Sequence, residues 1–326
     1  MTPAAIAKRN RTRVLIAFAA VYVLWGSTYL FIKYAIDTIP PFMLGASRFV
    51  VAGTLLYALA RWRGAPPASA RDWRLAAITG VLMLGMGNMA VVWSELSVPS
   101  GIVALIVSTV PIWIVLMDWL RPRGVRPRTP VFFGLGLGLV GMGILIGPGA
   151  IVGKGHVNEI GVLVLFIGSL GWALGSILTR GGGNRRSGSP VIFSALQMLA
   201  AAVAMAVMSL VAREPATFSL SAVSLRSALS WVYLVLAGSI IGYTAYIYLL
   251  GAVSAAKAAT YAYVNPVIAV FLGWAFANEP IGMRTVVAAV VILAGVAIIS
   301  TTHSSAHATG EHPIPSQSGE KVRSAA

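Results

Sequence analysis

The residues of this sequence that could do chemistry are a few polar and charged side chains set inside long apolar stretches. Arg48 lies about seven residues into such a stretch, where a charge is costly and usually faces a cavity or an opposite charge. Its guanidinium could clamp a substrate carboxylate, or form a gate by pairing with Glu95 or Asp37. Outward snorkelling or a structural ion pair would explain the same position without a function. The candidates for gating or charge pairing are Arg48, Glu95, Asp118 and Lys257.

Two of these candidates are acids, and both are expected near a membrane face. Glu95 lies roughly 31 Å beyond Arg74 along a helix, whereas Asp118 comes just before Arg121. Either acid could exchange a proton or simply pair with a neighbouring charge. Lys257 begins another apolar stretch. Its side chain could anchor that helix at the membrane interface or attract anionic cargo. Because no stretch has an acid at its centre, a cationic substrate is disfavoured.

Polar and aromatic side chains near the middle of the apolar stretches are the better candidates for binding a substrate. Asn88 and Asn265 place amide dipoles in hydrocarbon, so each needs a hydrogen-bond partner or water. Such a site could hold the ammonium and carboxylate of an amino acid. Helix–helix contacts for the asparagines and lipid contacts for the aromatics are the alternatives. The candidate binding residues are Trp25, Tyr29, Asn88, Trp93, Thr109, Trp172, Tyr243, Tyr246, Tyr261 and Asn265, and the candidate hinges are Pro111 and Pro266.

The elements that must position these residues are ten apolar stretches of about 20 residues, the length that crosses the ~30 Å hydrocarbon core as a helix. Of the 326 residues 58% are hydrophobic and 10% are charged, which excludes a soluble fold. The sequence predicts an all-α integral membrane protein with ten transmembrane helices. They are Val14–Ile36, Pro41–Ala60, Leu75–Leu96, Gly101–Leu120, Thr129–Gly147, Ile160–Thr179, Pro190–Ala212, Leu229–Leu250, Ala258–Ala277 and Met283–Ser300.

The formal net charge of +15 could indicate nucleic acid as a partner, but its distribution indicates membrane orientation. If the N-terminus is cytoplasmic, 18 of the 24 basic residues fall in cytoplasmic segments, as the positive-inside rule demands. We therefore expect a multi-pass protein of the inner (plasma) membrane with both termini in the cytoplasm. Its expected partners are the lipid bilayer and a small-molecule substrate, without nucleic acid, cofactor or metal. A homodimer is also allowed.

The two halves of the sequence echo one another. Pro111 and Pro266 each follow a matched valine by 13 residues, and a tryptophan follows each proline by eight. Each half carries five predicted helices, an odd number, so the second copy must enter the membrane inverted relative to the first. Inverted repeats are typical of secondary transporters, whose site lies near the midplane between the halves. The matched pairs are Val98 with Val253, Pro111 with Pro266, Trp119 with Trp274, Trp25 with Trp172, and Lys33 with Arg180.

These features resemble the drug/metabolite transporter superfamily, in particular its ten-helix members built from two inverted five-helix EamA repeats. The resemblance is carried by Trp25-Gly26-Ser27-Thr28, by Pro40-Pro41 leading to Arg48-Phe49, by Ser254 to Ala259 followed by Pro266, and by Gly273-Trp274 followed by Glu279-Pro280. Within the superfamily, the first two of these motifs look like those of YedA-type metabolite exporters. The resemblance implies EamA repeats at 14–148 and 160–301 and leaves the two ends of the chain uncovered. From the charge we expect a basic cytoplasmic N-terminus at residues 1–13, and from the Ser, His, Pro and Gly content a disordered cytoplasmic tail at 302–326.

The resemblance also implies a secondary active or facilitative transporter that exports small metabolites by alternating access, with amino acids or related amphipathic molecules as cargo. A multidrug or cation exporter is the first alternative. An intramembrane enzyme acting on lipid-linked substrates is the second, and it would need clustered acids, paired histidines or an activated nucleophile. The chain has no cysteine, its four histidines lie outside the apolar stretches, and its acids are scattered. We therefore expect a protein that is not an enzyme.

Overall fold

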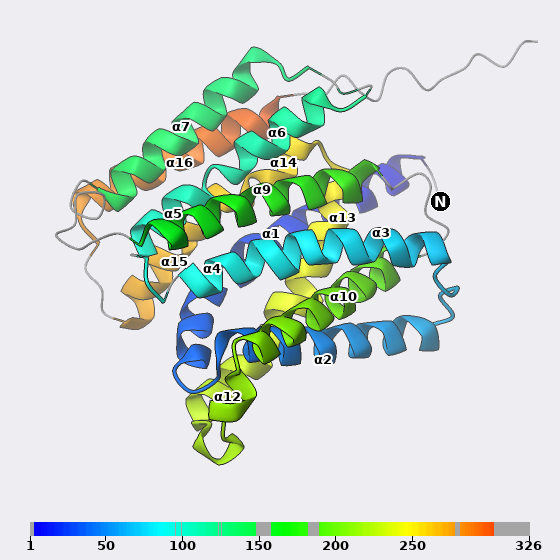
Figure 1. The fold of residues 1–326 in the computed structure, drawn as a ribbon. Helices are drawn as coiled ribbons and strands as arrows, with labels where there is room; N and C mark the ends of the chain where they lie inside the picture. The colour runs from blue at the N-terminus through cyan, green and yellow to red at the C-terminus, as the bar shows by residue number, and fades with distance from the viewer. Residues whose placement is uncertain are drawn as a thin grey trace, which may run out of the picture.

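The computed structural model describes residues 3–94, 96–98, 100–122, 124, 126–147, 158–181, 189–277 and 281–302 of the protein. Every regular element within these ranges is a helix, which confirms the predicted all-α fold class (Figure 1). In the first half the elements are α1 (Pro3–Ile36), α2 (Pro41–Trp62), α3 (Ala70–Gly80), the π-helix η1 (Val81–Asn88), α4 (Met89–Ser94), α5 (Ser100–Val107), α6 (Val110–Leu120) and α7 (Thr129–Ile146). In the second half they are α9 (Glu159–Gly181), α10 (Pro190–Val211), α11 (Glu214–Thr217), the 3-10 turn η3 (Leu220–Ala222), α12 (Leu225–Tyr233), the π-helix η4 (Leu234–Tyr243), α13 (Thr244–Ala252), α14 (Ala255–Ala259), α15 (Tyr261–Ala277) and α16 (Met283–Thr301).

Nine helical stretches within the described ranges are long and apolar enough to cross a membrane. The fourth predicted span differs, because it breaks into α5 and α6 at Ser108 and Thr109. Both hydroxyls donate to the carbonyl three residues earlier, at 2.7 Å each. Pro111 adds to the break because it has no N–H to donate to the carbonyl of Val107. Ten membrane-crossing helices therefore remain a prediction.

The first helix begins earlier than the predicted span Val14–Ile36. It includes most of the basic N-terminal segment, since α1 begins at Pro3 and continues for 34 residues. At 1.5 Å per residue α1 is about 51 Å long, which exceeds the ~30 Å apolar thickness of a bilayer. The charged end of α1 therefore extends beyond the apolar layer as a helix.

Several helices begin at a serine that caps the first turn. Ser69 and Asp72 form a reciprocal capping box at the start of α3, with hydrogen bonds of 3.2 and 3.1 Å. Ser189 caps α10, whose first residue, Pro190, has the backbone angle that a helix start requires. Ser224 caps α12 in the same way. These caps satisfy amide groups that would otherwise lack partners at the helix ends.

Long helix pairs from the two halves pack against each other, α2 along α10 and α7 along α16 (Figure 1). Glycines allow α7 and α16 to pack at short distance. A Cβ at Gly134 would lie 2.8 Å from the carbonyl oxygen of Gly295, and one at Gly141 would lie 2.6 Å from the side chain of Ile292. Small residues allow this approach of helices where lipid supplies no hydrophobic driving force. Glycines of the fifth predicted span are thus used for packing within the chain, and a homodimer stays a prediction.

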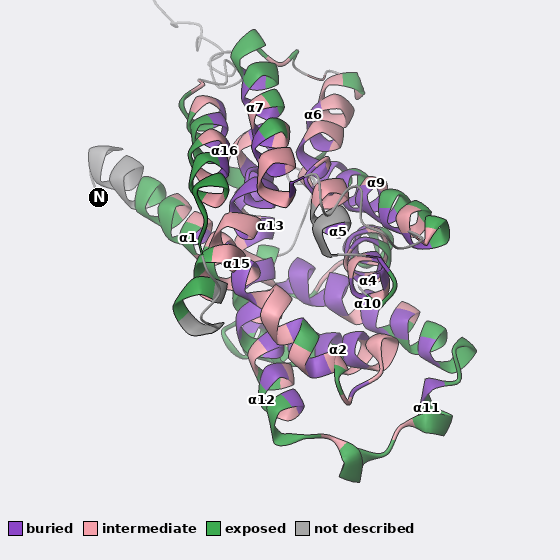
Figure 2. Ribbon diagram, turned by 90° about the vertical axis from the view of Figure 1, so that its left-hand side faces the viewer, coloured by how far each residue is buried: buried purple, intermediate pink, exposed green. Residues whose placement is uncertain are grey.

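The outer surface of the helix bundle is apolar. Large side chains such as Phe133, Leu163, Leu210 and Val211 are more than half exposed. Figure 2 shows that buried residues gather on the faces of the helices that point toward the middle of the bundle. Exposed apolar surface of this extent is expected where lipid replaces water around a protein.

Candidate functional site

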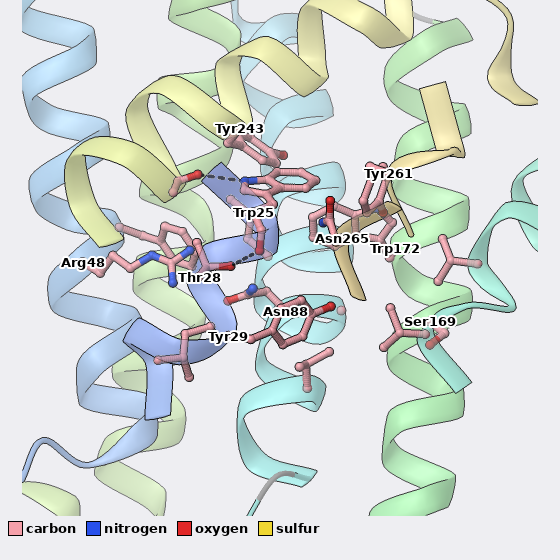
Figure 3. Close-up of a pocket in the computed structure, with 18 residues that line it drawn as sticks. Trp25, Thr28, Tyr29, Arg48, Asn88, Ser169, Trp172, Tyr243, Tyr261 and Asn265 are labelled. Carbon is pink, nitrogen blue, oxygen red and sulfur yellow. Dashed lines mark hydrogen bonds between the residues drawn. The ribbon is translucent and has the colours of Figure 1, made fainter. Parts of the chain in front are cut away.

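A pocket lies among α1, α2, η1, α4, α5, α6, α9, η4 and α15, and both halves of the chain line it (Figure 3). Its empty volume is about 760 Å³, including the space open to the surroundings. None of the lining residues that the structure describes is acidic. The predicted binding residues that line it are Trp25, Tyr29, Asn88, Trp172, Tyr243, Tyr261 and Asn265.

Four aromatic rings pack together at the pocket, and those of Trp25, Trp172 and Tyr261 form one of its walls. The ring of Trp25 lies 5.6 Å from that of Trp172 and 5.0 Å from that of Tyr261, both edge to face. Tyr246 packs behind them, with its ring 5.2 Å from Trp25 and its hydroxyl 2.9 Å from Ser176 Oγ. Edge-to-face pairs of this kind are worth about 0.5–1.5 kcal/mol each beyond their buried area. The wall is therefore rigid, and Tyr246 supports it without lining the pocket.

Each tryptophan of this wall packs on a glycine of a π-helix in the other half of the chain. A Cβ at Gly242 in η4 would lie 2.6 Å from Trp25 Nε1, and one at Gly87 in η1 would lie 2.9 Å from the Cβ of Trp172. Trp25 Nε1 also donates to the carbonyl of Gly238, at 3.0 Å. Gly242 follows Gly87 by the same number of residues as Pro266 follows Pro111, so the two glycines occupy matching positions in the two halves. The two contacts are thus counterparts. π-Helices often mark functional sites.

Arg48 is buried in the N-terminal half of α2, with 6% of its surface exposed. Its Nε donates to Ser239 Oγ at 2.8 Å, and Ser239 Oγ donates to the carbonyl of Leu234 at 3.1 Å. Figure 3 shows the guanidinium pointing into the pocket. Of the two acids predicted as partners, Asp37 is exposed and makes no ion pair in the described part of the chain, and Glu95 lies outside the described residues. Among the described residues, the side chain that accepts a hydrogen bond from Arg48 is the neutral Ser239, and pairing with Glu95 stays a prediction.

Two asparagine side chains also line the pocket. Asn265 on α15 is 3% exposed, and its Oδ1 has no hydrogen-bond partner among the described residues. Asn88, at the end of η1, lies between Arg48 and Asn265 in Figure 3. A buried carbonyl oxygen without a partner costs roughly 1–3 kcal/mol unless a ligand or water donates to it. The pocket therefore offers donors at Arg48 and an open acceptor at Asn265.

Three other predicted residues lie away from the pocket lining. Trp93 packs against the main hydrophobic cluster, and Thr109 precedes α6, where its Oγ1 accepts from Trp113 Nε1 at 3.1 Å. Lys257 lies half-buried in the short helix α14 and makes no ion pair with any described residue. The predicted hinges are Pro111, which is buried at the first turn of α6, and Pro266, which lies inside α15.

Asp118 belongs to a cluster of charges at the C-terminal ends of α6, α9 and α13. Its carboxylate lies 2.8 Å from Arg121 Nε and 3.9 Å from Arg180 Nε. Arg180 Nη1 also donates to the carbonyl of Leu250, at 2.9 Å, and to that of Val253. One arginine on α9 thus connects the end of α6 with the end of α13.

The pocket extends away from this cluster. It follows α1 over Trp25–Ile32 and follows η1 and α4 over Leu84–Val91. On α9 the described lining residues are Ser169 and Trp172, so the end of α9 that carries Arg180 contributes none of them. The pocket therefore lies toward the C-terminal ends of α1 and α4.

Several small polar residues of the site were not predicted from the sequence. Ser239 holds Arg48, Ser169 lines the pocket, and Thr28 lines it while its hydroxyl donates to the carbonyl of Trp25 at 2.7 Å. Thr28 could have been found, because it follows Trp25 by three residues and so lies on the same helix face. The sequence gives no comparable signal for Ser239, since its role depends on a residue 191 positions away.

Comparisons with known proteins agree on one family. The profile of the EamA-like transporter family matches residues 12–147 and 159–301. The chain belongs to this family. Among its relatives, the uncharacterized inner membrane transporter YedA of Escherichia coli (strain K12) is 37% identical over 287 residues, covering 87% of this chain and 89% of the relative. The uncharacterized transporter YvbV of Bacillus subtilis (strain 168) is 24% identical and covers 90% and 92%.

The fold is also known from experiment. A crystal structure with 20% sequence identity superposes with a TM-score of 0.72, covering 89% of this chain and 97% of that chain. This likeness shows the fold alone. As a member of the EamA family with apolar helices of membrane-spanning length, the protein is a multi-pass membrane transporter, which agrees with the expectation that it is not an enzyme.

Proposed function

We propose that this transporter exports small metabolites, amino acids or related amphipathic molecules, from the cytoplasm by alternating access of two inverted five-helix repeats. We place it in the inner membrane, with both termini in the cytoplasm, in line with its basic segments and the name of the YedA relative. The cargo binds in the pocket between the halves, where Trp25, Asn88, Trp172 and Asn265 line the space. No cofactor, metal or nucleic acid takes part.

The observation that carries the proposal is the reciprocal packing of the two halves around the pocket. Gly87 of the first half contacts Trp172 of the second, and Gly242 of the second contacts Trp25 of the first. Helix contacts follow the same rule, since η1 packs on α9 and η4 packs on α1, while α2 pairs with α10 and α7 with α16. Such a pattern is what two inverted copies related by an axis in the membrane plane would produce.

The shape of the pocket fits one end state of an alternating-access cycle. With the N-terminus in the cytoplasm, the C-terminal ends of α1 and α4, toward which the pocket extends, face outward. The cluster of Asp118, Arg121 and Arg180 then lies at the cytoplasmic ends of α6, α9 and α13. We interpret the structure as an outward-facing state that the contacts of Arg180 with the ends of α6 and α13 hold closed on the cytoplasmic side.

A multidrug or cation exporter is less well supported. An acid in the binding site generally neutralises a cationic cargo, and the described lining contains Arg48 but no Asp or Glu. The choice between proton coupling, exchange and facilitated transport is an outcome of the experiment below.

Counterflow in proteoliposomes tests the proposal. Vesicles containing the purified protein are loaded with an unlabelled amino acid or a quaternary amine, and uptake of the same labelled compound is followed with and without a pH gradient. We expect transient accumulation with amino acids or related acids, and none in protein-free vesicles. Accumulation with amines alone would overturn the amino-acid proposal. A dependence on the pH gradient would show proton coupling.

A further inference from the structure

The starting observation is that the pocket has a buried positive charge without a counter-charge among the residues that the structure describes. The Nε of Arg48 is occupied by the neutral Ser239, and the salt bridges of the described residues involve Asp118 only. Taking a guanidinium out of water is expensive unless an anion or several hydrogen bonds compensate. The arginine is held by Nε, so the two Nη nitrogens remain to form a fork that fits a carboxylate.

A second observation is independent of the first and concerns the opposite side of the same pocket. Asn265 Oδ1 is buried and lacks a donor among the described residues, although its side chain lines the pocket. In Figure 3 Asn88 and Trp25 lie between Asn265 and Arg48. A ligand that satisfies both sites therefore carries an anionic group at one end and an N–H or O–H group at a distance from it.

We infer that the cargo is an amphipathic organic acid whose carboxylate pairs with Arg48, and whose N–H or O–H group donates to Asn265 Oδ1. This inference rests on the proposed function and narrows its cargo class. The carboxylate is the favoured group because an anion compensates the charge of Arg48, whose neighbours among the described residues include the hydroxyl of Ser239 and the ring of Phe49 but no acid. An ammonium group is dispensable because the described lining has no acid to pair with it, although the rings of Trp25 and Tyr261 tolerate one. The aromatic wall accepts the apolar body of the acid.

Four matched compounds separate these contributions. N-acetylphenylalanine has a carboxylate and no ammonium, phenylalanine has both, phenylalaninamide has only the ammonium, and N-acetylphenylalaninamide has neither. Binding to the full-length protein in nanodiscs is followed by quenching of tryptophan fluorescence, since Trp25 and Trp172 line the pocket. We expect each carboxylate to bind at least about tenfold more tightly than its amide, as a charge-assisted bidentate contact implies. N-acetylphenylalanine should bind at least as tightly as phenylalanine.

Variants of Arg48 and Asn265 test whether these two residues cause the preference for carboxylates over amides. In Arg48→Gln the ratio between carboxylate and amide should fall to about one, whereas Arg48→Lys should keep part of it. Lys33→Gln is the matched control, because this exposed lysine lies outside the pocket lining and its loss should leave the ratio unchanged. Asn265→Asp should move the preference from N-acetylphenylalanine toward phenylalanine, since the new carboxylate can pair with the ammonium. A thermal scan of each variant shows that it is folded.

Every outcome of this experiment bears on the inference. A carboxylate preference that survives in folded Arg48→Gln, equal binding of acids and amides, or no binding of any compound by the wild type would overturn it. If the wild type carries out counterflow without preferring acids, the proposed transport stands and the cargo class falls. If acids bind with the expected preference but show no counterflow, the site assignment stands and the proposed transport falls.

Discussion

Removing Arg180 should open the pocket toward the cytoplasmic side. Its guanidinium connects α9 with the end of α13 through the carbonyls of Leu250 and Val253, and with α6 through Asp118. Arg180→Gln removes the charge and shortens the side chain, so these connections are lost together. Arg121→Gln is the matched control. Arg121 and Asp118 both lie at the end of α6, so their ion pair does not connect α6 to α13.

The size of the effect follows from the contacts. A hydrogen bond from a charged donor contributes about 1.5–3 kcal/mol, and the 24% exposure of the Arg180 side chain favours the lower value for each of its two carbonyl contacts. The ion pair to Asp118 at 3.9 Å adds about 1 kcal/mol, because both partners remain partly exposed. These contacts total about 4 kcal/mol. If half of this energy is lost when the protein changes from the outward-facing to the inward-facing state, removing Arg180 shifts the equilibrium between these states roughly 30-fold.

The assay uses the absence of cysteine from the chain. A single Ser169→Cys substitution places a thiol in the pocket lining, and a membrane-impermeant thiol reagent is added to right-side-out or inverted vesicles. We expect labelling from the outside in the otherwise unchanged protein. In Arg180→Gln the rate of labelling from the cytoplasmic side should rise at least about tenfold, and in Arg121→Gln it should change little. An unchanged rate of cytoplasmic labelling in folded Arg180→Gln would contradict this prediction. Equal labelling from both sides in the protein that retains Arg180 would contradict it as well.

Three further predictions concern the packing and orientation of the chain. Gly242→Ala should destabilise the protein by about 1–3 kcal/mol in thermal or denaturant unfolding, because the new Cβ meets Trp25, whereas Gly251→Ala, which faces open space, should not. Glu214→Gln should cost about 2–4 kcal/mol, since its buried carboxylate accepts from two backbone N–H groups of α2 and from Ser209 at 2.7–3.0 Å; equal stability of this variant and wild type would contradict the assignment. A C-terminal fusion to alkaline phosphatase should be inactive and one to a green fluorescent protein should fluoresce, and the reverse result would place the C-terminus outside.

Local hydrophobicity predicted the helices well, because a membrane span is a property of about 20 consecutive residues. The predicted stretches Pro41–Ala60 and Pro190–Ala212 end within two residues of the helices α2 and α10. The π-helices were not predicted, because their wider turns have no signature in apolar sequence. The break before α6 was missed for another reason. Thr109 was predicted to bind substrate from within a continuous span, but its hydroxyl, like that of Ser108, donates to the backbone carbonyl three residues earlier.

The candidate site could likewise be predicted only where local sequence was enough. The positions of Trp25, Asn88 and Asn265 within their predicted spans placed all three near the middle of the membrane, and the fold brings them to one pocket. What the sequence could not supply was the partner of a buried charge, because Arg48 meets Ser239 from the other half of the chain. Glu214 was overlooked for the same reason, since the helix start that it caps lies more than 170 residues earlier in the sequence.

We propose that cargo crosses the membrane through this pocket. Counterflow by the Ser169→Cys protein, measured before and after modification of the thiol, tests this route. We predict that complete modification abolishes counterflow and that a saturating transported acid slows modification. A Ser→Cys substitution at an exposed position such as Ser221 provides the control, and its modification should leave transport intact. Full counterflow after complete modification of Ser169→Cys would contradict the account.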